Sequence, residues 1–112
     1  MPLLRSPKIA TFTAACAFLG FASHARADQQ IRFQDHHFTP TTLAVAAGQP
    51  ITLSVANASN ETIEFESFKL NREKAVEPGE TITVKLPPLS PGNYDFYDDF
   101  HQDVPQGNIV AR

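Results

Sequence analysis

The sequence predicts an all-β domain, a β-sandwich of about seven short strands, from two observations. Apolar and polar residues alternate through most of residues 28–112, and no segment keeps the 3.6-residue period of an amphipathic helix. Glycine or proline stands at most junctions, at Gly48-Gln49-Pro50, Pro78-Gly79, Pro87-Pro88 and Pro91-Gly92. Short strands separated by regular turns are typical of a sandwich.

Seven segments carry this alternation, and each is expected to form a strand with one face toward the core. Their inward residues, in chain order, are Ile31 and Phe33; Leu43 and Val45; Ile51, Leu53 and Val55; Ile63 and Phe65; Ile82, Val84 and Leu86; Tyr94 and Phe96; and Ile109 and Ala111. Residues 68–77 lack the pattern. They fit one helical turn, a loop or a short edge strand, and are too few for an independent helix.

Two segments echo each other: L-A-V-A-A-G-Q-P-I-T-L-S-V at 43–55 and K-A-V-E-P-G-E-T-I-T-V-K-L at 74–86. Two copies are too few and too short for a repeat array. We therefore expect two strand–turn–strand edges with the same geometry, in preference to a duplicated module.

Residues 1–27 have the pattern of a cleaved secretory signal peptide. Arg5 and Lys8 supply a basic start, Ile9–Ala22 an apolar stretch, and Ala25-Arg26-Ala27 a small-x-small cleavage site. The context of Cys16 is a poor match to a lipoprotein site, so a discarded signal-peptide cysteine is the favoured interpretation. The sequence thus predicts a periplasmic protein with a single domain at residues 28–112.

The composition of residues 28–112 favours cations as partners. There are 6 Lys and Arg against 12 Asp and Glu, which gives a net charge of −6 with neutral histidine. Such a surface repels phosphate backbones and anionic lipids, which argues against nucleic-acid binding. The same residues contain no Cys and no Met, so neither a disulfide nor a sulfur ligand is available.

Candidate ligands lie near two expected strand ends. Glu64 and Glu66 project from one face of their strand, where two like charges repel unless a cation lies between them. Asp98 follows Tyr94 and Phe96 on an inward row and needs a polar partner there. His101 comes three residues later. A solvated strand face and a polar turn are the simpler alternatives for these residues.

Several segments of the sequence resemble those of the cupredoxins. The resemblance rests on V-A-A-G-Q-P-I-T-L-S-V-A-N-A-S, E-F-E, P-G-E-T-I-T-V-K-L, P-P-L-S-P-G-N-Y-D-F-Y and G-N-I-V, which cover nearly all of residues 28–112. It implies a Greek-key sandwich. It also places Glu64 at the first histidine ligand of the copper proteins, Asp98 at the cysteine and His101 at the second histidine.

The methionine ligand would fall near Pro105 or Gln106, neither of which replaces it. The resemblance therefore implies no type 1 blue copper, because that centre needs a thiolate. The remaining carboxylates and imidazole suit iron, or Cu(II) held without a thiolate.

Within the cupredoxins the chain is most similar to the EfeO-type branch, on the strength of E-F-E and E-K-A-V-E-P-G. That resemblance implies a periplasmic iron-binding protein beside a membrane iron permease and other components of the same uptake system. It implies Glu64, Asp98 and His101 as main ligands. Glu66 and Asp99 complete this site or form a neighbouring one, and His36 and His37, with Asp35, are expected nearby.

Three functions stay open from the sequence. The first is iron binding with assistance to Fe(II) oxidation, which would be an accessory activity of a binding protein more than an enzyme of its own. The second is a periplasmic Cu(II) carrier that uses His36, His37 and His101. The third is a structural or interaction sandwich without a metal.

Overall fold

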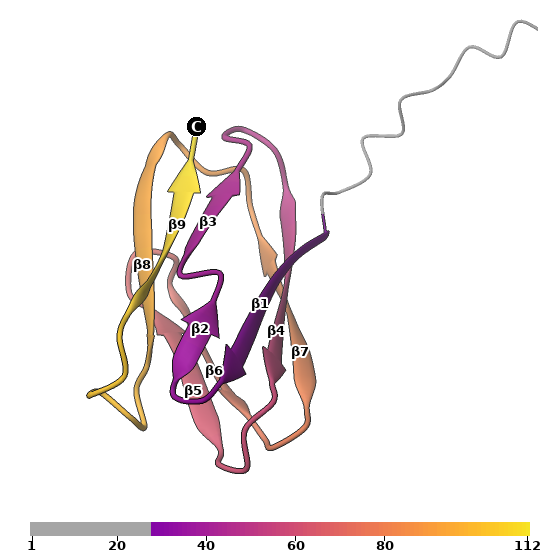
Figure 1. The fold of residues 1–112 in the computed structure, drawn as a ribbon. Helices are drawn as coiled ribbons and strands as arrows, with labels where there is room; N and C mark the ends of the chain where they lie inside the picture. The colour runs from indigo at the N-terminus through magenta and orange to yellow at the C-terminus, as the bar shows by residue number, and fades with distance from the viewer. Residues whose placement is uncertain (1–27) are drawn as a thin grey trace, which may run out of the picture.

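The structure, a computed structural model, describes residues 28–112. The expected signal peptide lies outside the described residues. Within residues 28–112 the chain forms nine strands (Figure 1). They are β1 (Asp28–Gln34), β2 (His37–Thr39), β3 (Thr42–Val45), β4 (Ile51–Asn57), β5 (Ile63–Ser67), β6 (Arg72–Val76), β7 (Thr81–Leu86), β8 (Gly92–Asp98) and β9 (Gly107–Ala111).

The strands form two facing sheets. Sheet 1 has the order β2-β1-β4-β7 and sheet 2 the order β3-β9-β8-β5-β6. The β1–β4 and β3–β9 pairs are parallel and the other pairs are antiparallel. The all-β sandwich expected from the alternation is confirmed, although residues 28–112 contain nine strands where about seven were predicted.

Of the two additional strands, β2 has only three residues, too few to show a clear alternation, and β6 lacks the alternation that marks the others. In β2 only Phe38 is buried, and in β6 only Val76 is buried. Both strands lie at sheet edges, where one side of the backbone has no neighbouring strand. The edge-strand alternative for residues 68–77 is therefore the correct one.

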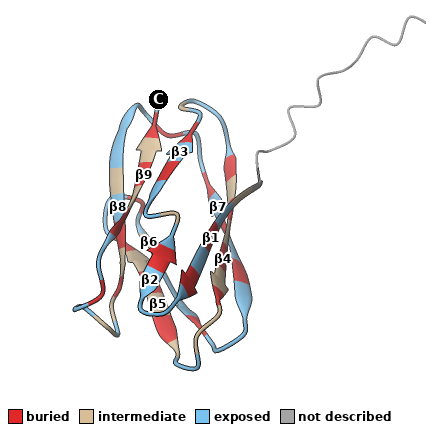
Figure 2. Cartoon of the chain, in the orientation of Figure 1, coloured by how far each residue is buried: buried red, intermediate tan, exposed pale blue. Residues whose placement is uncertain are grey.

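The core fills the space between the sheets, and buried and exposed residues alternate along most strands (Figure 2). Four phenylalanine rings join the sheets at its centre. Phe38 packs edge-on against Phe33 and against Phe96, with ring centroids 5.1 and 5.0 Å apart, and Phe96 lies 5.4 Å from Phe65. Such pairs add about 0.5–1.5 kcal/mol each beyond the area they bury.

The two echoing segments take the same role in the fold. Each runs from an edge strand of sheet 2 into sheet 1, from β3 to β4 and from β6 to β7. Gly48 and Gly79 turn the chain with φ values of 76° and 75°, a region that favours glycine. The echo therefore reflects two strand–turn–strand edges with one geometry, as expected.

Four connections meet at one end of the sandwich: the β1–β2 turn and the β4–β5, β6–β7 and β8–β9 connections (Figure 1). The last residue lies at the other end, where Arg112 O accepts a hydrogen bond from Ala47 N–H (3.2 Å). Residues 28–112 contain no helix of the length and apolarity needed to cross a bilayer.

Candidate metal centre

The pairing of β5 with β8 places the candidate ligands on two different faces. Phe65 pairs with Asp98 and Glu66 pairs with Tyr97. Because paired residues project to the same side, Asp98 lies on the core side with Phe65. Glu64 and Glu66 project to the outer side, as the sequence predicted.

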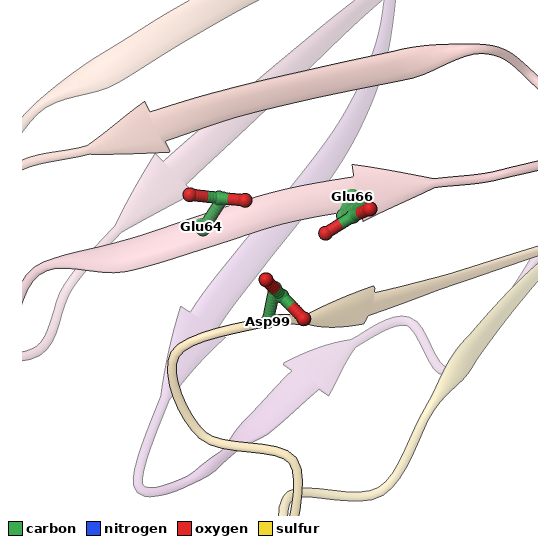
Figure 3. Close-up of side chains that lie close together, drawn as sticks. All are labelled: Glu64, Glu66 and Asp99. Atoms are coloured by element: carbon green, nitrogen blue, oxygen red, sulfur yellow. The ribbon is translucent and has the colours of Figure 1, made fainter.

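On the outer side, three carboxylates converge (Figure 3). Ligand atoms from Glu64, Glu66 and Asp99 all lie within 4.8 Å of one another, and each side chain is half-buried. The first two come from β5, and Asp99 follows the end of β8, where its N–H donates to Glu64 O (3.0 Å). We call these three residues the acidic cluster.

The carboxylates of the acidic cluster are close enough to repel one another. A hydrogen bond with Glu73, partial burial and the negative charges of Glu73, Asp99 and Glu66 raise the pKa of Glu64 from its usual 4.5 to about 7. The Oε1 atom of Glu64 is buried without a hydrogen-bond partner. A cation would supply the missing partner and offset the repulsion.

Asp98 lies on the other side of β8, 1% exposed, and both oxygen atoms of its carboxylate have hydrogen-bond partners in the protein. Its Oδ1 accepts the backbone N–H groups of Glu64 (2.9 Å) and Phe100 (3.1 Å). Its Oδ2 lies 2.6 Å from Nδ1 of His101. The inward carboxylate thus has the partners that its burial requires.

His101 bridges two acids. Besides the contact with Asp98, its Nε2 lies 3.1 Å from Glu61 Oε2, and its side chain is 25% exposed. The hydrogen bond to Asp98 raises the pKa of His101, with further contributions from the charges of Asp98 and Glu61, while burial opposes the rise.

The β1–β2 turn brings His36 to the same place. Gln34 pairs with His37, so Asp35 and His36 form a two-residue hairpin turn, with φ values of 52° and 60°. The His36 ring lies 6.5 Å from the His101 ring, centroid to centroid, at 79°. His37 lies on β2 and is exposed.

Glu64, Asp98 and His101, the main ligands expected to share one site, therefore lie in two groups, and Glu66 and Asp99 lie with Glu64. The acidic cluster unites Glu64, Glu66 and Asp99, while Asp98 and His101 contact each other on the other side of β8 with His36 nearby.

The sequence matches the profile of the Cupredoxin-like domain family over residues 9–111. The chain belongs to the cupredoxin-like family. Solved structures agree on the fold. Reduced auracyanin from Roseiflexus castenholzii superposes with a TM-score of 0.65 at 14% identity, over 76% of this chain and 96% of that protein. The metal-binding domain of the Cu(I)-exporting P-type ATPase CopA from Streptococcus pneumoniae D39, with Cu(I), gives 0.64 at 13% identity, over 76% and 84%.

The cupredoxin-like chain also has a curated relative. An uncharacterized protein of Rickettsia prowazekii (strain Madrid E) is 44% identical over 83 residues, which are 74% of this chain. The chain spans 66% of that relative's length, just under two thirds.

The donor atoms of this cupredoxin-like chain do not fit a blue-copper centre. Residues 28–112 supply no thiolate, and Asp98, which the sequence resemblance aligns with the cysteine, accepts three hydrogen bonds from the protein. The described residues therefore cannot form a thiolate–copper centre. The oxygen atoms of the acidic cluster suit harder cations.

Sequence reasoning missed Glu61 and Glu73 as members of these groups. Glu73 pairs with Glu66 across β5 and β6, a contact that depends on the register of an edge strand without alternation. Glu61 lies in a connection held by buried Asn57, whose Nδ2 donates to Glu61 O (2.7 Å). The Asn-Ala-Ser segment before Glu61 was the available signal, because asparagine and serine side chains often bind nearby backbone in turns.

Proposed function

We propose that the protein is an exported, cupredoxin-like metal-binding protein that holds iron in the acidic cluster and serves an iron-uptake system. The observation that carries the proposal is the convergence of Glu64, Glu66 and Asp99 within 4.8 Å around a buried, unpartnered carboxylate oxygen (Figure 3). Carboxylates are preferred ligands of hard cations, and Fe(III) is harder than Fe(II).

The charge of the acidic cluster favours the oxidised ion. Each carboxylate interacts more strongly with a charge of +3 than with +2, and Glu73 adds a fourth negative group nearby. The cluster would thus lower the free energy of Fe(III) relative to Fe(II) and assist oxidation by dissolved oxygen. This accessory activity needs no second cofactor.

The cellular setting belongs to the same proposal. The signal-peptide pattern of residues 1–27 supports a periplasmic location. The resemblance to the EfeO-type branch supports a membrane iron permease as the partner that receives the ion. The net charge of −6 over residues 28–112 suits a protein that attracts cations.

Metal titration with matched variants tests the proposal. Metal-free protein is titrated with Fe(II) and Fe(III) by calorimetry, and the bound metal is counted by elemental analysis. We expect one iron per chain, with affinity reduced about tenfold or more in Glu64→Gln, Glu66→Gln and Asp99→Asn. Asp95→Asn is the control. Asp95 is an exposed residue on β8, the strand that also carries Tyr97, and the variant should bind iron as tightly as the unmodified protein does.

Two results would argue against this function. If iron does not bind, or binds equally well to all the cluster variants, the chain is a metal-free interaction module or uses other ligands. If iron binds but Fe(II) autoxidises at the same rate with and without the protein, the oxidation part of the proposal is wrong.

A further inference from the structure

The end of the sandwich where four connections meet carries imidazole groups that the acidic cluster does not use. His36 comes from the β1–β2 turn, Glu61 from the β4–β5 connection and His101 from the β8–β9 connection. His101 lies at the centre, with its Nε2 3.1 Å from Glu61 Oε2 and its ring 6.5 Å from that of His36. An open hollow lined by His36, Glu61 and Asn60 adjoins these groups.

Buried Asp98 determines which nitrogen of His101 is available. A carboxylate oxygen accepts hydrogen bonds, so the 2.6 Å contact with Asp98 Oδ2 assigns the hydrogen to Nδ1. Nε2 is then the atom directed away from the core, toward Glu61. A carboxylate that holds one imidazole nitrogen while the other faces a cation is the usual arrangement around metal-ligating histidines.

We propose that Nε2 of His101, the His36 imidazole and the Glu61 carboxylate form a second metal site, for a divalent ion that prefers imidazole, Cu(II) or Zn(II), with Asp98 positioning His101. This site goes beyond the iron proposal, because it shares no ligand with the acidic cluster. Two of its ligands, His36 and Glu61, also lie outside the positions that the copper proteins' ligands would occupy in this chain.

The distances are compatible with an ion after small adjustments. Metal–nitrogen and metal–oxygen bonds are ~2.0–2.2 Å long, so an ion fits between Nε2 and Glu61 once their 3.1 Å contact opens. Two imidazoles on one tetrahedral ion have ring centres about 5 Å apart, against 6.5 Å here. His36 is exposed, so rotation of its side chain can close the difference.

The surrounding structure holds two of the ligands in place. Asn57 and Ser59 donate hydrogen bonds to Glu61 O, at 2.7 and 3.1 Å, which fixes the backbone beside the site. Asp98 fixes His101 as described. The site therefore needs little ordering of the His101 side chain and of the Glu61 backbone when an ion binds, which favours affinity, while the half-exposed Glu61 side chain is free to adjust.

Separate titrations of the untagged, metal-free full chain with Cu(II) and Zn(II) test the proposal, with the electron paramagnetic resonance spectrum of the Cu(II) form as the structural readout. We expect one strong site for at least one of the two ions and, for Cu(II), hyperfine splitting from two imidazole nitrogens. His36→Gln and His101→Gln should each lower the affinity at least as much as the ~10–100-fold typical of second-sphere changes, and each should remove one nitrogen from the spectrum. Glu61→Gln should weaken binding without removing a nitrogen.

His37→Gln is the matched control, because His37 adjoins His36 in the chain but lies on β2. Asp98→Asn tests positioning: it should weaken binding while the spectrum keeps two nitrogens, and a thermal melt of the variant reports whether it is folded. Glu64→Gln should weaken iron binding and leave Cu(II) and Zn(II) binding unchanged. The iron proposal and the second-site proposal can therefore be refuted independently of each other. The proposal would be overturned if the Cu(II) spectrum showed no nitrogen splitting. It would also be overturned if His36→Gln and His101→Gln left the Cu(II) and Zn(II) affinities unchanged.

Discussion

Asp98 shows how one residue connects the core to the functional end of the molecule. Its carboxylate, 1% exposed, binds the start of β5 through Glu64 N–H and the β8–β9 connection through Phe100 N–H and His101. An alanine here leaves two backbone donors and one imidazole without their acceptor.

We therefore expect Asp98→Ala to lower the free energy of unfolding by about 3 kcal/mol, since each unsatisfied buried group costs ~1–3 kcal/mol. Asp98→Asn should cost less, because its amide oxygen still accepts. Urea unfolding followed by circular dichroism measures both values. A loss below about 0.5 kcal/mol for the alanine variant would mean that water replaces the carboxylate without cost.

The pKa of Glu64 makes stability depend on pH. With a pKa of about 7 in the folded chain against 4.5 in the unfolded chain, Glu64 holds a proton in the folded state that the unfolded state has lost. The metal-free protein should therefore lose stability as the pH rises from about 4.5 to about 7. His101, whose pKa is also raised, adds a loss above its usual 6.5.

The difference in unfolding free energy between the unmodified protein and Glu64→Gln, measured across this range, isolates the contribution of Glu64. As the pH rises, the free energy of unfolding of the unmodified protein should fall relative to that of the variant. A difference that stays constant, or that changes in the other direction, would contradict the raised pKa.

At the scale of elements, the pairing of β8 with β9 depends on Gly107. This residue pairs with Phe96, and a Cβ atom at Gly107 would overlap the buried Phe96 ring. Because Phe96 also packs against Phe38 and Phe65, the ring has no free space to move into.

Gly107→Ala should therefore destabilise the protein by about 1–3 kcal/mol, the usual cost of overpacking. Chemical unfolding measures this loss. Combining it with Phe96→Leu, which makes room, should recover part of the loss in a double-mutant cycle. Additive losses would show that the overlap with Phe96 is not the cause.

The β1–β2 hairpin turn holds the proposed ligand His36 in a strained backbone conformation. Both turn residues, Asp35 and His36, have positive φ, a conformation for which Asn-Gly is preferred in two-residue turns. We expect Asp35→Asn with His36→Gly to stabilise the protein by about 1 kcal/mol, as measured by urea unfolding, while Cu(II) or Zn(II) affinity falls. No gain in stability would mean that the native turn carries no strain.

The strands and their faces were predictable where burial alternates. Glu64 and Glu66 share a face, and Asp98 points inward, because a period of two is visible in the sequence. The partners across strands were not predictable. Alternation by itself places Glu64 outward and Asp98 inward; the resemblance to the copper ligands is what joined them in one expected site. Which outward residue of β8 lies beside Glu64 and Glu66 depends on the register of β5 against β8, which periodicity does not reveal.

At the scale of the whole molecule, a bound ion should increase the stability of the folded chain. A ligand that binds only the folded chain stabilises it by ~2.7 kcal/mol at a hundredfold excess over Kd. We expect saturating Fe(III) to raise the melting temperature at pH 7.5 and to raise it much less at pH 5, where Glu64 keeps its proton. Differential scanning fluorimetry with and without a chelator checks this. Equal shifts at both pH values would exclude Glu64 as a ligand.

The chain's last residue and its proposed metal sites lie at different ends of the sandwich (Figure 1). Arg112 adjoins the β3–β4 turn, whereas His36, Glu61 and His101 come from connections at the other end. A biosensor built on this chain should therefore be anchored through Arg112. Its metal-responsive end would then face the sample, and the electrode or bead would not obstruct the arriving ions.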